Sequence, residues 1–165
     1  MKKFTHVLLI FIAFFWTITG TANASETRIT HGELEISNLT IRATPPNAPV
    51  GGGYITIKNM GDVPDTLLGG SAAFAAAIEV HEMKMENDIM KMRALADGLE
   101  IPAGGEVVLK PGGYHLMFMK LGEQLVKGET RKVVLNFKKA GKIELEFEVQ
   151  DLRQIREGMK NSHKH

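Results

Sequence analysis

The chain has 165 residues, no cysteine and a formal net charge of +1 at pH 7. This length suffices for one domain with a hydrophobic core. The near-neutral charge, without a basic block, argues against nucleic acid or anionic lipid as a partner. The lack of cysteine excludes disulfides and thiolate metal sites, and no lipid-bearing cysteine is expected.

The N-terminal segment predicts a signal peptide over residues 1–24. Lys2 and Lys3 precede an apolar stretch at residues 7–16, and the small residues Ala22 and Ala24 follow it. The apolar stretch is about half the roughly 20 residues that a membrane-spanning helix needs, so we expect cleavage before Ser25 rather than a membrane anchor. Cleavage would leave 18 basic against 19 acidic residues, a formal charge of −1. We expect a monomer in the periplasm, with no membrane span after signal cleavage.

The rest of the chain has the two-residue periodicity of β-strands. Apolar and polar residues alternate over residues 33–42, 54–59, 106–109, 131–137 and 142–149, between turns rich in glycine and proline. This pattern predicts an all-β, antiparallel β-sandwich or barrel as a single domain over residues 25–150. The only helix that we expect is one turn within residues 122–127. The three glycines at residues 51–53 favour a tight turn with positive φ, because the Lys-Ser/Thr of a phosphate-binding loop is missing.

Residues 151–165 are predominantly polar and predict a flexible C-terminal tail. His163 and His165 could add a loose Cu(II) or Zn(II) site there. The alternative is that these two histidines bind no metal.

Methionines and histidines gather in one window of the chain. Six of the nine methionines fall between residues 83 and 119, together with His115, and His81 lies just before them. On extended strands, positions 81, 83 and 85 share one face, as do 90 and 92, and 115, 117 and 119. Residues two apart on a strand are about 6–7 Å apart, so His115 and Met117 can converge on one ion.

Thioether sulfur and neutral imidazole, without thiolate or carboxylate, suit Cu(I). Zinc would require cysteines or several histidines, calcium would require oxygen ligands, and a blue-copper site would require a cysteine. The spacing therefore predicts a Cu(I) site formed by His81, Met92, His115 and Met117. Met83, Met85, Met90 and Met119 are possible auxiliary ligands, and Met90 is the main rival of Met92.

At these residues the sequence resembles the periplasmic copper chaperones of the PCuAC type. Their pattern is a histidine, a methionine about eleven residues later, and then His-x-Met, which His81, Met92 and residues 115–117 match. The last gap is one residue longer here. Segments 48–59, 80–83, 101–105 and 109–117 also match, and the likeness covers residues 31–149.

The resemblance implies a cupredoxin-like fold that binds Cu(I) through two histidines and two methionines. It also implies a copper-accepting partner, either a cytochrome c oxidase subunit carrying the CuA centre or its assembly factor.

Two other functions remain open from the residues alone. A metal-free or structural β-sandwich binding module in the periplasm would use the methionines as core and therefore bury them. A copper enzyme would need catalytic groups, but no Ser-His-Asp or paired-carboxylate arrangement stands out, and the expected mature N-terminus is Ser25 rather than histidine. We therefore expect no enzymatic activity.

Overall fold

The structure is a computed structural model that describes residues 28–162. The predicted signal peptide, His163 and His165 lie outside this range. Almost all the described residues outside turns belong to strands. These are β1 (Ile29–His31), β2 (Leu34–Arg42), β3 (Val50–Asn59), β4 (Asp65–Ala72), β5 (Ala75–Glu86), β6 (Ile89–Ala94), β7 (Leu99–Ile101), β8 (Glu106–Leu109), β9 (Tyr114–Leu121), β10 (Thr130–Phe137) and β11 (Gly141–Gln150).

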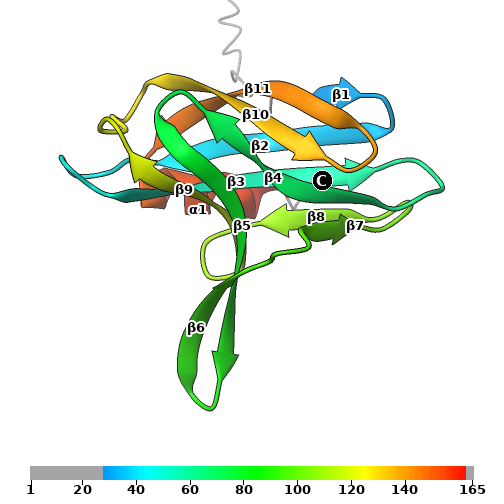
Figure 1. The fold of residues 1–165 in the computed structure, drawn as a ribbon, viewed down its shortest axis with the longest axis horizontal. Coiled ribbons are helices and arrows are strands. Elements are labelled where there is room, and N and C mark those ends of the chain that lie inside the picture. Colours follow the sequence, from blue (N-terminus) through cyan, green and yellow to red (C-terminus); the bar gives the residue numbers. More distant parts are fainter. Residues whose placement is uncertain (1–27, 163–165) are drawn as a thin grey trace, which may run out of the picture.

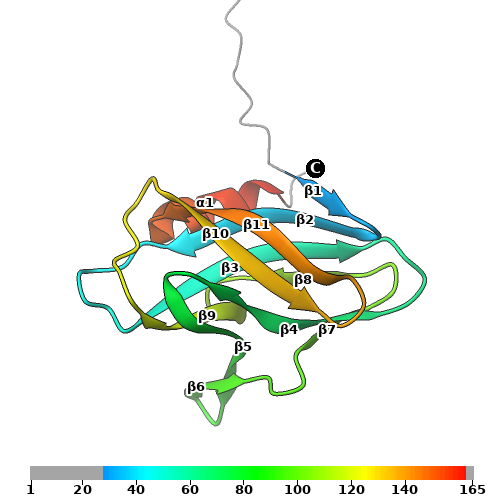
Figure 2. The same ribbon diagram turned by 45° about the horizontal axis from the view of Figure 1, so that its top comes forward.

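Seven of these strands close into a barrel (Figures 1 and 2). Their order around the barrel is β2-β11-β10-β4-β5-β9-β3, and pairing of β3 with β2 closes it. All these pairs are antiparallel except β11 with β2, which is parallel at residues 148–150 and 40–42. The predicted all-β, cupredoxin-like fold is confirmed.

Strand β11 shows most clearly how the barrel interior is built, because apolar and charged residues alternate along it. Along β11 the side chains of Ile143, Leu145, Phe147 and Val149 are at most 4% exposed, whereas the residues between them face solvent. Because side chains on a strand point alternately to its two faces, this sequence can fold only with its apolar face inward.

The hairpin of β5 and β6 leaves the barrel and projects into solvent (Figure 1). Residues 75–82 of β5 pair with β9 in the barrel wall, and residues 83–86 pair only with β6. Asn87 and Asp88 form the two-residue turn, with φ of 51° and 61°. Positive φ at both positions is typical of the type I′ turn, which matches the twist of two antiparallel strands.

Up to residue 162, the C-terminal segment is not the flexible tail that its polarity predicted. It forms helix α1 (Leu152–Ser162), which contacts β2 and buries Ile155 to 2% exposure. The backbone N–H of Gln154 donates to Asp151, and the Asp151 N–H donates to the Gln154 side chain. This reciprocal pair is a capping box, which explains why a mostly polar segment begins a helix here. No helix in residues 28–162 is long and apolar enough to cross a membrane.

Two smaller predictions were wrong. Residues 122–127 form bends and a turn rather than a helical turn. The glycines at 51–53 are not a tight turn but part of β3, and none of the three has positive φ. Their lack of a side chain makes room for neighbours, since a Cβ on Gly53 would lie 2.6 Å from Cε2 of Phe118.

Candidate metal centre

The two histidines of the predicted site face each other across neighbouring strands. His81 on β5 is the direct partner of His115 on β9, and their ring centroids are 5.8 Å apart. Since a metal–nitrogen bond is about 2 Å long, two imidazoles on one ion have centroids within about 6 Å of each other. Sheet register therefore brings the rings to a separation that one ion could bridge.

Each ring has one nitrogen held by an oxygen that can only accept a hydrogen bond. His81 Nε2 donates to the Glu79 carboxylate at 2.8 Å, and His115 Nδ1 donates to the backbone carbonyl of Gly113 at 3.0 Å. The lone pairs of the neutral rings therefore lie on Nδ1 of His81 and Nε2 of His115. The Nδ1 atom of His81 is buried without a hydrogen-bond partner in the described structure. Metal-binding histidines commonly have this arrangement, in which one ring nitrogen donates to an oxygen and the other is free.

His115 is held in its neutral form. Burial lowers the pKa of its imidazole, the hydrogen bond to Gly113 opposes that shift in part, and the nearby His81 lowers the pKa further. The ring is 6% exposed. A neutral imidazole has the lone pair that a metal ion requires.

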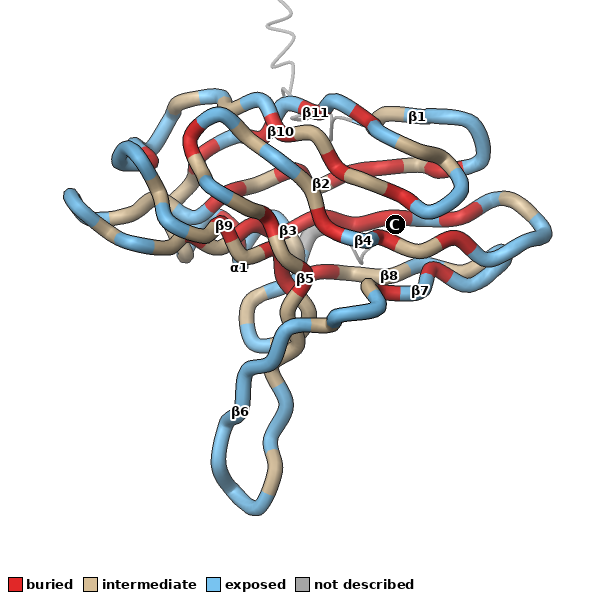
Figure 3. The backbone as a smooth tube through the Cα atoms, in the orientation of Figure 1, coloured by how far each residue is buried: buried red, intermediate tan, exposed pale blue. Residues whose placement is uncertain are grey.

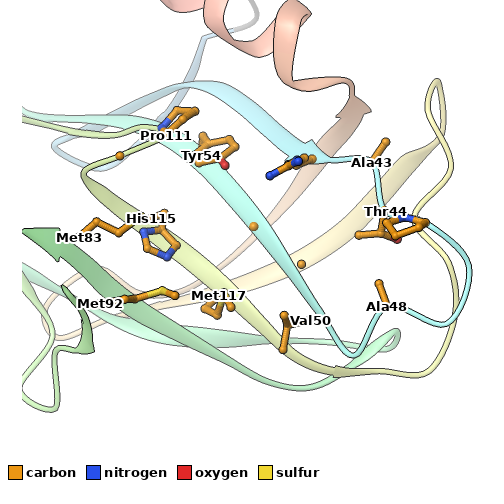
Figure 4. Close-up of a pocket in the computed structure, with 15 residues that line it drawn as sticks. Ala43, Thr44, Ala48, Val50, Tyr54, Met83, Met92, Pro111, His115 and Met117 are labelled. Carbon is orange, nitrogen blue, oxygen red and sulfur yellow. The ribbon is translucent and has the colours of Figure 1, made fainter. Parts of the chain in front are cut away.

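A pocket of about 360 Å³ opens beside His115 (Figure 4). Met83, Met92 and Met117 line it together with this histidine, and Gly51 and Gly52 of β3 form part of its wall. Gly52 is the strand partner of Met117, and a Cβ on it would lie 3.3 Å from the Tyr54 hydroxyl, which also lines the pocket. The pocket is therefore an opening in the barrel surface with three thioethers and one imidazole along it.

Three of the four predicted ligands line this pocket, namely Met92, His115 and Met117. The fourth, His81, does not line it, but its ring lies beside that of His115. Met83 lines the pocket and is the direct strand partner of Met92, whereas Met90 pairs with Met85 farther along the hairpin. Met119 pairs with Val50 and Ala77 on the barrel and does not line the pocket. The register thus favours Met83, rather than Met90, as the neighbour of Met92.

The exposure of the hairpin methionines contradicts a core role for them. Met85, Met90 and Met92 are 57%, 49% and 50% exposed. Figure 3 shows that the hairpin is mostly exposed, whereas the buried residues are concentrated in the barrel. Methionines that fill a core are buried, so these three side chains are not there to pack the barrel.

The donors gathered here are soft. In residues 28–162 no group of three or more histidine, aspartate or glutamate side chains is placed to hold a metal ion. One imidazole and three thioethers line the pocket instead, with the second imidazole beside the first, a donor set that suits Cu(I) far better than zinc or calcium.

Sequence reasoning did not identify Arg42 and Tyr54 as pocket residues. Burial raises the pKa of the Tyr54 hydroxyl, and the positive charges of Arg42 and Arg156 oppose that shift. Tyr54 directly follows the triple glycine, but no periodicity distinguishes it from other strand residues. Tyr54 pairs with Thr40 of β2, and only the closure of the barrel brings it to the pocket.

Comparison with solved structures defines the class of fold. The copper-bound PCuAC domain from PmoF2 superposes with a TM-score of 0.64 at 22% identity, over 76% of this chain and 98% of that one. The apo PCuAC domain from PmoF1 gives 0.64 at 20% identity, over 76% and 99%. The Cu(I) form of DR1885 from Deinococcus radiodurans gives 0.54 at 28% identity, over 68% and 75%. The protein has the fold of these PCuAC domains, a cupredoxin-like barrel.

Residues 34–149 match the family model described as "Putative lipoprotein LpqE-like". The chain therefore belongs to the LpqE-like family. A curated relative, "Putative lipoprotein Lxx21020" of Leifsonia xyli subsp. xyli (strain CTCB07), is 33% identical over 81 residues, which are 49% of each protein. The match thus spans about half the length of that relative.

Proposed function

We propose that this protein binds Cu(I) at the His81–His115 pair and the adjoining methionines, and carries it between other proteins. The proposal rests mainly on how His115 is placed among the three methionines of the pocket. Its neutral ring, with Nδ1 held by Gly113, lines a pocket with Met83, Met92 and Met117. The solved PCuAC domains named above, two of them in copper-bound form, support the same cargo.

The absence of thiolate favours a carrier over a storage or electron-transfer site. Neutral imidazole and thioether ligands hold Cu(I) without the strong charge attraction of a thiolate, so a thiolate-rich acceptor can take the ion by ligand exchange. We also propose that the chain is exported by the segment at residues 1–24 and acts in the periplasm. The name of the Leifsonia relative as a lipoprotein is in keeping with an exported protein.

The test is a competition titration against a chromophoric Cu(I) chelator under anaerobic conditions. The native protein should bind one tight equivalent, and the variant His115→Ala with Met117→Ala should lose it. Leu125→Val is the control, because this core residue of the barrel lies outside the pocket and should leave affinity unchanged. An undiminished Cu(I) affinity in the double variant would show that the site is assigned wrongly. X-ray absorption of the Cu(I) form would then count sulfur and nitrogen ligands directly.

A further inference from the structure

The projecting hairpin carries four methionines on one face. In the register of β5 and β6, Met83 is opposite Met92 and Met85 is opposite Met90, so the four thioethers form two successive pairs. The inner pair lines the pocket. The outer pair, Met85 and Met90, lies two residues farther from the barrel, a step of about 6–7 Å along each strand.

The opposite face of the same hairpin has a different chemistry. Arg93 and Glu82 form an ion pair at 2.6 Å, and Lys91 and Glu86 form another at 3.0 Å. Both ion pairs join β5 to β6 on the face turned away from the methionines. The hairpin is therefore two-sided, with charges paired on one face and four neutral soft donors on the other.

The outer pair is exposed to solvent, so packing in a core does not explain why these two positions are methionine. Met85 is 57% and Met90 is 49% exposed, and β6 pairs only with β5 in the described structure. Directly opposite residues on antiparallel strands have Cβ atoms about 4.5–5.5 Å apart. Two flexible thioethers on such a pair can reach one ion without any change in the backbone.

We propose that Met85 and Met90 form an outer Cu(I) site, distinct from the pocket site and filled after it. This inference rests on the proposed function, because it assumes that the pocket binds Cu(I). A thioether of the inner pair, Met83 or Met92, supplies a third ligand by rotation of its side chain. With fewer donors and no imidazole, the outer site binds the ion more weakly than the pocket does.

The two sites together provide a path for the ion along the hairpin. A Cu–S bond to Met85 or Met90 forms as a bond to His115 or Met117 breaks, while Met83 or Met92 stays attached. The ion remains Cu(I) throughout, and no electron or proton is transferred. The outer site is then the place where an acceptor reaches the ion, because it is the part of the ligand set farthest from the barrel wall.

The experiment titrates Cu(I) anaerobically into the mature chain with its methionine methyl groups labelled with ¹³C. The first equivalent should shift the methyl signals of Met92 and Met117, and the second should shift those of Met85 and Met90. The variant Met85→Leu with Met90→Leu keeps the apolar volume and should lose the second of these equivalents while it retains the first. Met60→Leu is the matched control, since Met60 is equally exposed at 51% but lies away from the hairpin, and it should bind both equivalents.

Failure of the inference and failure of the proposed function give different results. If the signals of Met85 and Met90 do not move with excess Cu(I), or if the double leucine variant still takes up both equivalents, the outer site does not exist, although the pocket site can stand. If the variant His115→Ala with Met117→Ala still binds the tight equivalent of Cu(I), the pocket assignment is wrong. The proposed order of filling is then wrong as well.

Discussion

Single hydrogen bonds decide which nitrogen of each histidine can bind a metal. Glu79 is 45% exposed, but its carboxylate lies 2.8 Å from Nε2 of His81, which is itself only 12% exposed. The negative charge makes that ring a better electron donor at its other nitrogen. Glu79 is also the strand partner of Met117. It is therefore a neighbour of two candidate ligands, His81 and Met117.

Glu79→Gln should weaken Cu(I) binding by about tenfold, the lower end of what the loss of such a supporting contact costs. The amide oxygen can still accept the hydrogen bond, so only the charge is removed and the fold should be unaffected. Competition titration measures the change in affinity. Glu82→Gln is the control, because Glu82 lies on the opposite face of β5 and pairs with Arg93. Equal affinities in the two variants would rule out a supporting role for Glu79.

At the scale of elements, helix α1 shows how one buried side chain anchors a mostly polar segment. Its only fully buried apolar residue among those described is Ile155, which is 2% exposed. The capping box of Asp151 and Gln154 starts the helix, and Lys127 pairs with Asp151 at 2.7 Å. Local hydrogen bonds therefore set where the helix begins, and the buried Ile155, with the half-buried Leu152 and Met159 on the same face, packs it on the barrel.

Ile155→Ala should lower the free energy of unfolding by about 2–5 kcal/mol, the usual cost of removing a buried isoleucine side chain. Urea denaturation followed by circular dichroism would measure this loss. Lys160→Ala, at an exposed position of the same helix, should change stability by no more than about 0.5 kcal/mol. If both variants unfold at the native midpoint, α1 does not contribute to the stability of the barrel.

At the scale of the whole molecule, closure of the barrel assembles the site from distant parts of the sequence. β3 pairs with both β2 and β9, so the glycines of β3 lie beside Met117 while β9 also pairs with β5. The candidate ligands therefore come from the barrel wall and from a hairpin that leaves it. The proposed carrier function would use both features, because the wall positions the histidines and the hairpin exposes methionines to solvent.

We predict that the copper-loaded protein gives its ion to the CuA domain of cytochrome c oxidase, the acceptor that its resemblance to PCuAC-type chaperones implies. A centre with cysteine thiolates should bind copper more tightly than neutral thioethers do. The two proteins would be mixed anaerobically and separated, and the copper in each would be measured. A CuA domain with its cysteines replaced by serine should gain none. Retention of the copper by the loaded protein would exclude this acceptor.

The sequence by itself determined the fold class and singled out candidate ligands, three of which the structure places along one pocket. Alternation along residues 142–149 required one buried face, and the absence of cysteine beside clustered methionines left only soft neutral donors. The sequence also contains the capping signal Asp151-x-x-Gln154, which the polar composition of this segment does not reveal. The strand alternation and the capping signal are present in the sequence because each depends only on neighbours within a few residues.

Tertiary structure decided what depends on strand register. It paired His81 with His115, placed Met83 rather than Met90 beside Met92, and put the glycines at 51–53 in a barrel wall instead of a turn. It also showed that the hairpin methionines are solvated. Periodicity gives the face on which a side chain lies, but not the partner strand or whether another layer covers that face. The physical reason is that register and burial arise from pairing between segments far apart in the chain.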